Sequence, residues 1–446
     1  MAVDDSDGPL GPNPLSDVES LGDLVGGRPE ILVLATSVLG YDLVVQFTNR
    51  FFAGQLAHVG ASGLTIGLFG TLGMFLGMVF PYLSGELPES ADERLVLVVV
   101  GCLSTLGMVI WLAAPPFEKT DPLGVHLPAW MWLLVGQVFV YTWRLRGAGT
   151  AFANVRRRTP HEALVTGLDT GEMLRRGALV VGMVPVVVVF YFLSFHPGFQ
   201  VLVALGGALG FTALVVQLVI GTGGKPPERI EFRGVERLSA DLRSFPRDLE
   251  PLLVGDTLAR FAVGMIHMFL VLYVMSVKNL DASVLGVHLD SVVVFSLFMA
   301  VEATVALVSA PLGEELVREF GARSTLAGSL VVTAAFPGLL FLAGQDVLAV
   351  AVLFGVFGLR LVGQPAREVF VEQLSDAGNE RAGRSYRTVR NALVVPSSVV
   401  GGALYTVSPD LLMLAASVVG LVGAATFLRV EPLPDYLTLY EDDGRR

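Results

Sequence analysis

Charged residues, lysine and cysteine are all scarce in this sequence. Only 16% of the 446 residues are charged, against about 25% in soluble domains. Of the 30 basic residues, 27 are arginine and 3 are lysine. The single cysteine, Cys102, excludes an intramolecular disulfide, and no Cys/His cluster has metal-ligand spacing. Hydrolase and nucleotide-binding motifs are also missing, so we predict a protein that is not an enzyme and needs no cofactor or metal.

Apolar residues make up 53% of the chain, and its mean hydropathy is +0.66. Many segments reach the roughly 20 apolar residues that span a bilayer. We therefore predict an all-α membrane protein with twelve transmembrane helices. They are expected near residues 31–53, 61–84, 95–115, 128–146, 176–196, 199–221, 251–275, 284–310, 324–343, 346–363, 390–407 and 410–429.

Changes in composition along the chain predict its domains. Residues 1–30 hold seven acidic residues and one arginine, which lacks the basic start of a signal peptide and is typical of a disordered acidic tail. Residues 222–250, rich in glycine, proline and charge, form a predicted linker, part of it a short amphipathic helix at the membrane surface. This linker divides a six-helix half at 31–221 from another at 251–430, and a C-terminal tail follows at 431–446.

The distribution of basic residues predicts the orientation. Arginines cluster after the fourth predicted helix, in the central linker and after the tenth helix, whereas the opposite loops offer only Lys119, Lys278 and Arg50. Cytoplasmic loops carry the excess of Lys and Arg. We therefore predict a multi-pass protein of the cytoplasmic membrane with both termini in the cytoplasm.

The two predicted halves share residues at a fixed offset of 214. Asp42 matches Asp256 in the first helix of each half. Leu145-Arg146-x-x-Gly149 matches Leu359-Arg360-x-x-Gly363, and the segment from Arg176 to Val181 matches that from Arg390 to Val395. Charged anchors that recur at one offset indicate a duplication. A repeat of six helices keeps its orientation, so we expect a pseudo-twofold axis along the membrane normal.

Polar residues inside the seventh predicted helix point to a functional site. Asp256, Arg260 and His267 fall on one helical face. A charge at mid-bilayer costs about 2.5–3.5 kcal/mol on insertion scales, so such residues face a bundle interior or a water-filled cavity. Asp256 and Arg260 are spaced to pair. They either act on a solute and a coupling ion or form a structural ion pair, while His267 is either a proton carrier or a satisfied imidazole.

Other predicted spans carry further candidates for a solute or coupling-ion site. In the first helix Asp42, Gln46 and Asn49 share one face, with Arg50 beside it. The fourth helix has Gln137 and Tyr141 along one side. In the eighth helix Glu302 lies near mid-membrane with no evident local base in sequence, which favours proton binding there.

Several loop motifs resemble those of the major facilitator superfamily of secondary transporters. The segment from Pro311 to Arg323 follows the family's loop pattern, although its acid and base, Arg318 and Glu319, are in the reverse order. We expect these two side chains to pair. The segments beginning at Gly85 and at Arg146 match other family elements more weakly, and the helix around Pro185 lacks most of the antiporter motif. The resemblance implies gating roles at Gly85, Glu89, Arg94, Arg146, Gly149, Glu314, Glu315, Arg318, Glu319, Gly321, Arg323 and Arg360.

The resemblance also implies a function. It implies a monomeric secondary active transporter that moves a small-molecule substrate by alternating access, coupled to protons or sodium, with the first, fourth, seventh and tenth helices lining the cavity. Short outer loops favour efflux. Two alternatives stay open: an importer of a small polar or anionic metabolite, and a non-transporting membrane sensor or scaffold with the same fold. The lipid bilayer is the expected surrounding, and nothing in the sequence indicates nucleic acid.

Overall fold

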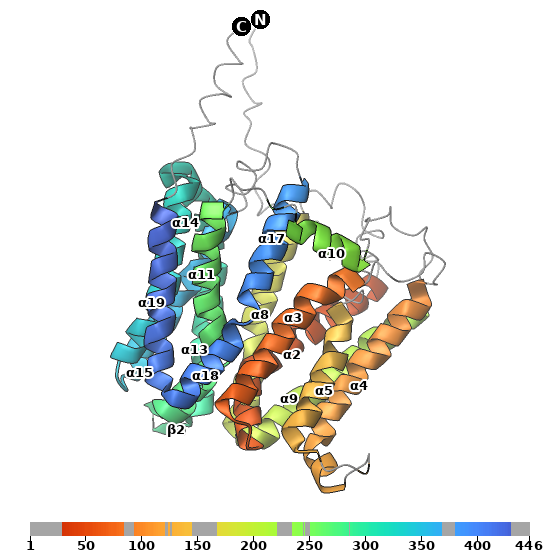
Figure 1. Cartoon of the computed structure of the whole chain (residues 1–446). Helices are drawn as coiled ribbons and strands as arrows, with labels where there is room; N and C mark the ends of the chain where they lie inside the picture. The colour runs from red at the N-terminus through yellow and green to blue at the C-terminus, as the bar shows by residue number, and fades with distance from the viewer. Residues whose placement is uncertain are drawn as a thin grey trace, which may run out of the picture.

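The structure is a computed structural model, and it describes residues 29–83, 93–120, 124, 127–144, 167–220, 234–243, 245, 250–284, 286–367 and 380–429. The described part of the chain is mostly helical (Figure 1). The side chains of Asp42, Arg94 and Arg144 lie outside the description, although their backbone is helical.

A first group of helices comes from the N-terminal part of the chain. Its members are α2 (Pro29–His58), α3 (Gly63–Leu83), α4 (Glu93–Thr120), α5 (Ala129–Tyr141) with the short helix η2 (Thr142–Arg144), α8 (Gly167–Phe192) and α9 (Phe195–Ile220). Helix α2 packs on α9, and α4 packs on both α5 and α9. Large side chains such as Phe51, Phe52 and Trp111 fill the space between these helices.

A second group comes from the C-terminal part. Its members are α11 (Glu250–His267), α12 (Leu270–Leu272), η4 (Tyr273–Val277), α13 (Ser291–Val308), α14 (Ala310–Leu342), α15 (Val347–Gly358), η5 (Leu359–Val362), α17 (Glu380–Val394), α18 (Ser397–Val407) and α19 (Pro409–Leu428). Helix α11 packs on α19, α14 packs on α19, and α13 packs on α15.

The two groups meet along two helix pairs, α3 with α18 and α8 with α13. Glycines allow the first pair to approach closely. A Cβ added at Gly67 would lie 2.5 Å from the Ser398 carbonyl oxygen, and one at Gly402 would meet the backbone of Gly63. Small residues at such positions are what lets two transmembrane backbones come close.

The two ends of the molecule differ. The short helix α10 (Gly234–Arg243) lies across the upper end in Figure 1, which we name the linker end. The hairpin of β1 (Ala282–Val284) and β2 (Val287–Leu289) lies at the lower end, which we name the hairpin end. At the linker end, the Tyr82 hydroxyl donates to Asp241 Oδ2 at 3.2 Å and lies 2.5 Å from the Thr388 hydroxyl, so α3, α10 and α17 are joined there.

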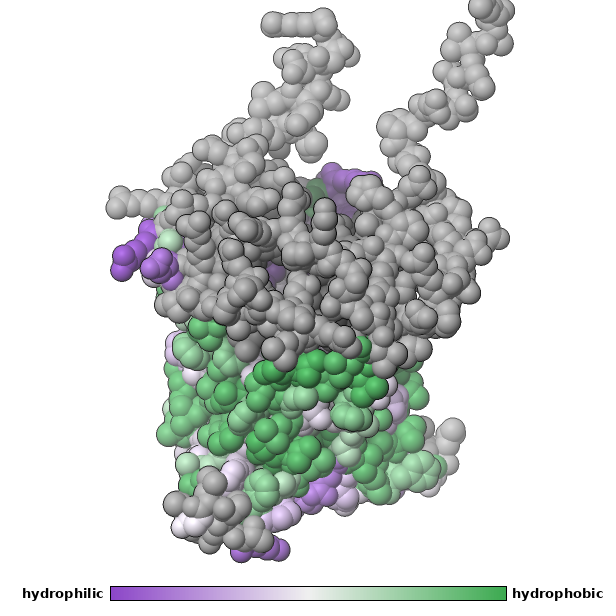
Figure 2. Space-filling model, turned by 90° about the vertical axis from the view of Figure 1, so that its right-hand side faces the viewer, coloured by the Kyte–Doolittle hydropathy of each residue, from purple (hydrophilic) through white to green (hydrophobic). Residues whose placement is uncertain are grey.

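Seven of the described helices are long and apolar enough to cross a membrane, and eight are if the bent pair Leu252–His267 and Leu270–Val277 forms one span. Ala129–Tyr141 and Leu179–Phe192 are shorter apolar helices. Figure 2 shows one side of the molecule, where apolar side chains cover most of the surface formed by described residues. Exposed Val181, Phe192, Leu348 and Val407 belong to the same apolar exterior, which is the surface a bilayer covers.

Several sequence-based expectations about elements were wrong in detail. The predicted helix 284–310 begins only at Ser291, because residues 282–289 form the short hairpin. Most of the predicted loop 311–323 is helical and belongs to α14, which is interrupted at Gly321 with φ 79° and ψ 157°. The predicted helix 251–275 is bent by 52° after His267. The short helix expected within the linker exists as α10, but it packs on α17 and α3.

Candidate functional site

A cavity of about 630 Å³ lies between the two groups of helices. It is lined from α2, α3 and α5 on one side and from α11, α14 and α17 on the other. Seven residues predicted from sequence line it: Gln46, Asn49, Gln137, Tyr141, Asp256, Arg260 and His267. Segments far apart in sequence therefore bring together the polar residues that the sequence places inside apolar helices.

Asp256 is the centre of a buried ion cluster. Its carboxylate is fully buried and accepts from Arg390 Nη1 and from the Tyr386 hydroxyl, at 3.1 Å and 2.9 Å to Oδ2. Arg367 Nη2 lies 3.1 Å from Oδ1, and Arg260 Nε lies 3.5 Å from the same oxygen. The predicted pair of Asp256 and Arg260 is thus present, but it is one contact among three arginines. We name these residues the Asp256 cluster.

Glu302 is the centre of a second buried cluster. Arg360 Nη2 donates to Glu302 Oε1 at 2.6 Å, and Arg50 Nη1 lies 3.6 Å from Oε2. Arg360 is also held by the Phe357 carbonyl, at 2.7 Å, and by the Phe357 ring, 3.8 Å from its guanidinium carbon. The expectation that Glu302 lacks a local base was therefore wrong, because its two arginines come from α2 and η5, far away in the sequence. We name these three residues the Glu302 cluster.

The two clusters are close to one cavity. Arg50 and Arg360 line the 630 Å³ cavity, and together with Glu302 they line a smaller adjoining space of about 110 Å³. His267, the last residue of α11, lines the larger cavity within electrostatic reach of Arg50, Glu302 and Arg360. A charged ligand in the larger cavity would therefore meet groups of both clusters.

The first group of helices contributes the neutral polar part of the wall. Gln137 Nε2 donates to the Phe69 carbonyl at 3.0 Å, while Gln137 Oε1 is buried without a hydrogen bond among the described residues. A Cβ at Gly73 would lie 2.8 Å from both Gln137 Nε2 and the Tyr141 hydroxyl. Gly73 therefore lets α3 approach these two side chains.

The structure describes only some of the residues implicated in gating. Arg318 Nη2 lies 3.9 Å from Glu314 Oε2, whereas it was expected to pair with Glu319. Neighbouring residues of a helix point apart, and residues four apart face each other, so the helical form of this segment explains the difference. Glu315 and Glu319 are exposed, and Arg323 Nη2 donates to the Leu428 carbonyl at 2.6 Å.

Other implicated residues lie elsewhere. Arg360, expected in a cytoplasmic motif, belongs to the Glu302 cluster. Gly85, Glu89, Arg146 and Gly149 lie outside the described residues, as do the side chains of Asp42 and Arg94.

Three members of the Asp256 cluster were missed as site residues in the sequence: Arg367, Tyr386 and Arg390. Arg367 and Arg390 were counted among the charges at the cytoplasmic loop, because the predicted helices ended at 363 and began at 390. A signal for Arg390 was present, since it matches Arg176 at the repeat offset.

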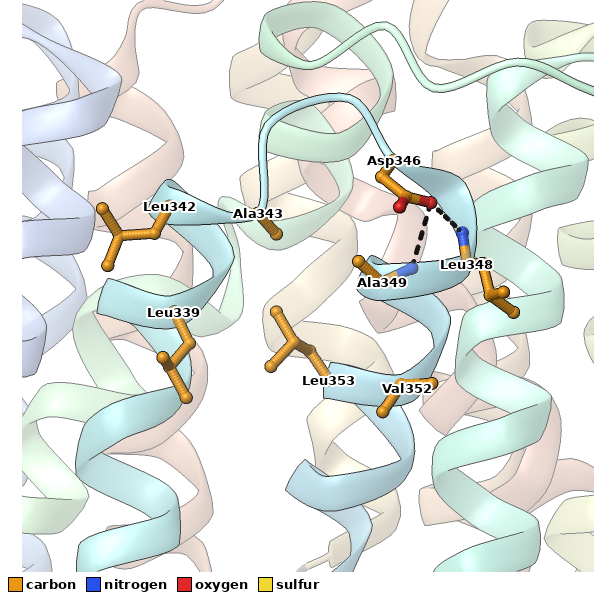
Figure 3. Close-up of a pocket in the computed structure, with 8 residues that line it drawn as sticks. All are labelled: Leu339, Leu342, Ala343, Asp346, Leu348, Ala349, Val352 and Leu353. Carbon is orange, nitrogen blue, oxygen red and sulfur yellow. Dashed lines mark hydrogen bonds between the residues drawn. The ribbon is translucent and has the colours of Figure 1, made fainter.

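A second hollow, of about 530 Å³, lies between α14 and α15 (Figure 3). Seven of the eight residues drawn there are leucine, alanine or valine. The other, Asp346, accepts from the backbone N–H groups of Leu348 and Ala349 at 2.9 and 3.2 Å, so it caps the start of α15. Apart from this capping carboxylate, the side chains that line the hollow are apolar and do not suit a polar solute.

No family model matches the chain. An uncharacterised MFS-type transporter of Methanocaldococcus jannaschii is 23% identical over 394 residues, which cover 84% of this chain and 87% of that protein. The solved structure of the nucleoside transporter NupG has a TM-score of 0.68 at 13% identity, covering 91% of this chain and 99% of that one.

Two further solved structures have the same fold. A bacterial homologue of the iron transporter ferroportin, in an inward-facing state, has a TM-score of 0.65 at 16% identity over 90% of this chain and 98% of that one. A POT family transporter in complex with 5-aminolevulinic acid has a TM-score of 0.62 at 14% identity, over 93% and 96%. These relatives are transporters and not enzymes. The chain is therefore similar in sequence to a transporter of the major facilitator type, and it has the multi-pass helical fold of these solved transporters.

Proposed function

We propose that the chain is a secondary active transporter that moves a small solute by alternating access around the cavity between its two groups of helices. The observation that carries this proposal is the cavity itself, which is lined by both groups and bears two buried ion clusters. Ionised groups inside apolar helices are costly and mark solute or ion pathways. A sensor or scaffold with this fold has no need to retain them.

The helix contacts support two related halves at 31–221 and 251–430, joined by the linker at 222–250. The pairing of α2 with α9 corresponds to that of α11 with α19, and α4 with α9 to α14 with α19. The two most extensive contacts between the groups, α3 with α18 and α8 with α13, correspond as well. We therefore infer twelve spans, a pseudo-twofold axis along the membrane normal and a monomeric transporter whose two halves rock against each other around the cavity.

Orientation and energy source complete the proposal. The arginine-rich loops support a position in the cytoplasmic membrane with the linker end and both termini inside. Coupling to protons or sodium is the energy source, because nucleotide-binding motifs are absent from the sequence. Export is the favoured direction. Uptake of a small anionic metabolite is the second candidate, which the number of arginines around the cavity supports.

Counterflow tests the proposal. The full chain is reconstituted in vesicles and offered labelled drugs, sugars, amino acids and organic anions, each exchanged against the same unlabelled compound. We expect exchange of one class, lost in Arg260→Gln and retained in Arg243→Gln, since Arg243 is exposed on α10. Imposed pH and sodium gradients of either sign then give the direction and the coupling ion. A well-folded protein that exchanges nothing in the panel would contradict the proposal and favour the sensor or scaffold.

A further inference from the structure

We infer that the cavity binds a small organic anion, whose carboxylate or phosphate group lies between Arg260 and Arg50. This inference rests on the proposed function, because it assigns a substrate class to the same cavity. It is carried by the surplus of positive charge, by the unequal engagement of the arginines and by the apolar character of the remaining wall.

The two clusters are not electrically balanced. The Asp256 cluster holds three arginines against one carboxylate, and the Glu302 cluster holds two arginines against one carboxylate. Among the described residues, five arginines against two carboxylates leave a formal charge of three positive, with His267 counted as neutral. If the side chain of Asp42 were a further carboxylate at this cavity, two positive charges would still remain. Uncompensated charge of this kind in a membrane interior is costly, and an anionic ligand would offset part of the cost.

The arginines are engaged to different degrees. Arg360, Arg367 and Arg390 lie 2.6 to 3.1 Å from their carboxylates, and their side chains are 18%, 16% and 9% exposed. Arg260 and Arg50 have the longer contacts, 3.5 and 3.6 Å, and the larger exposure, 39% and 29%. The more weakly engaged arginines are thus the more exposed ones.

This difference suits ligand binding. A guanidinium has five N–H donors in a planar fork that matches a carboxylate or a phosphate. Arg260 and Arg50 can accept an anion while the three tighter arginines keep Asp256 and Glu302 in place. The clusters would then act as a scaffold that holds two donors ready for the ligand.

The rest of the wall suits an organic body. Met74, Met78, Val263 and Met268 line the same cavity. The volume of about 630 Å³ is within the usual range for small-molecule sites. Methionine side chains adapt to ligands of irregular shape. An anion with an apolar body would therefore use both parts of the wall, which inorganic anions would not.

Matched pairs of probes test the charge requirement. Purified full-length protein is heated with phenylacetate or its neutral counterpart phenylacetamide, and with phenyl phosphate or phenol. We expect the anion of at least one pair to raise the melting temperature and its neutral counterpart to leave it unchanged, because ligands that bind the native state stabilise it by mass action. The carboxylate and phosphate pairs distinguish the two kinds of anion. Equal effects of anion and neutral counterpart in both pairs would overturn the inference.

Variants test the position of the anion. Arg260→Gln and Arg50→Gln each leave at least one arginine on the carboxylate, so both are expected to fold, and each should weaken binding of the anion at least tenfold. Arg260→Lys keeps the charge and should lose less, and Arg243→Gln, at an exposed position of α10, should bind as the native protein does. Native affinity in both glutamine variants would overturn the inference.

Flux measurements separate this inference from the proposed function. Vesicles are loaded with the anion that binds, and its exchange is followed. Anion binding without exchange would contradict transport and leave the anion site standing. Exchange of a neutral or cationic solute by a protein that binds no anion would leave transport standing and overturn the anion site.

Discussion

Asp256 and Arg260 form one ion pair, but the two side chains stand in different surroundings. Asp256 is fully buried and contacts three arginines, whereas Arg260 is 39% exposed and makes one contact of 3.5 Å with it. Removing one partner of a buried pair costs about 3–5 kcal/mol, because an uncompensated charge remains. Removing an exposed partner costs below about 1 kcal/mol. Stability and binding should therefore separate between these two neighbours.

Unfolding measurements test this separation. Asp256→Asn should lower the free energy of unfolding by about 3 kcal/mol or more, and Arg260→Gln by less than about 1 kcal/mol. Denaturant or thermal unfolding in one detergent compares the two variants, with Arg318→Gln as the exposed control. If Asp256→Asn had a higher free energy of unfolding than Arg260→Gln, the Asp256 cluster would not be what holds the helices together.

Within the proposed proton-coupled cycle, Glu302 is our candidate for the proton-binding group, since it contacts arginines of both helix groups. We expect Glu302→Gln to exchange solute in counterflow at a rate within a few-fold of the native protein. The same variant should fail to accumulate solute against its gradient under an imposed proton gradient. Gradient-driven accumulation at the native level in Glu302→Gln would exclude this residue as a coupling site.

At the residue scale, features that lie within a single helix could be predicted from the sequence, whereas contacts between helices could not. The polar face of Asp256, Arg260 and His267 follows from helical spacing alone, and all three line the cavity. The contacts of Arg50 with Glu302 and of Arg390 with Asp256 join residues 252 and 134 positions apart. Such pairs depend on how helices pack, which periodicity does not encode.

Among the elements, we expect the contact between α3 and α18 to close the cavity at the hairpin end. Gly63, Gly67 and Gly402 let the two backbones approach, and the Thr71 hydroxyl accepts from the backbone N–H of Val399 at 3.0 Å. Met268 lies directly beside this contact, since a Cβ at Gly70 would lie 2.8 Å from its Cγ. A larger side chain at Gly67 must separate the helices, because it would meet backbone atoms.

Thiol labelling tests the closure. Met268→Cys is introduced together with Cys102→Ser, because Cys102 is exposed, and intact cells receive a membrane-impermeant maleimide from the predicted outer side. Adding Gly67→Leu should speed the labelling of Met268→Cys at least several-fold. Gly328→Leu is the control, because no atom lies within 4 Å of its Cβ position. Equal rates in both backgrounds would mean that this contact does not close the cavity.

The elements themselves were predictable where a long apolar run carried the signal, as in α3, α9 and α19. The ends of polar helices were not. Helix α17 begins at Glu380, ten residues before the predicted start, because its first turns are polar and its stability comes from packing against α10 and α11. The bend after His267 could not be predicted from the sequence either, because no proline or glycine stands there.

For the whole molecule, the repeat makes a prediction about side chains that the structure does not describe. In the second group Asp256 pairs with Arg390, at 3.1 Å. Asp42 and Arg176 occupy the equivalent positions 214 residues earlier, and α2 packs on α8. We expect these two side chains to pair, so that Asp42→Asn and Arg176→Gln are each destabilising and their effects are not additive. A coupling energy near zero in this double-mutant cycle would exclude the pair.

The whole-molecule claim is that the two groups of helices rock about the cavity, so that one end opens as the other closes. Pairs of spin labels on a Cys102→Ser background measure this directly. Ala57→Cys with Val407→Cys reports the hairpin end, and Val215→Cys with Leu428→Cys reports the linker end, because all four positions are exposed. Pulsed EPR then gives the distance distribution of each pair at pH 5 and pH 8, with and without the anion that binds. We predict two populations at each end whose proportions change in opposite directions, whereas one fixed distance at both ends, or lengthening at both ends together, would contradict alternating access.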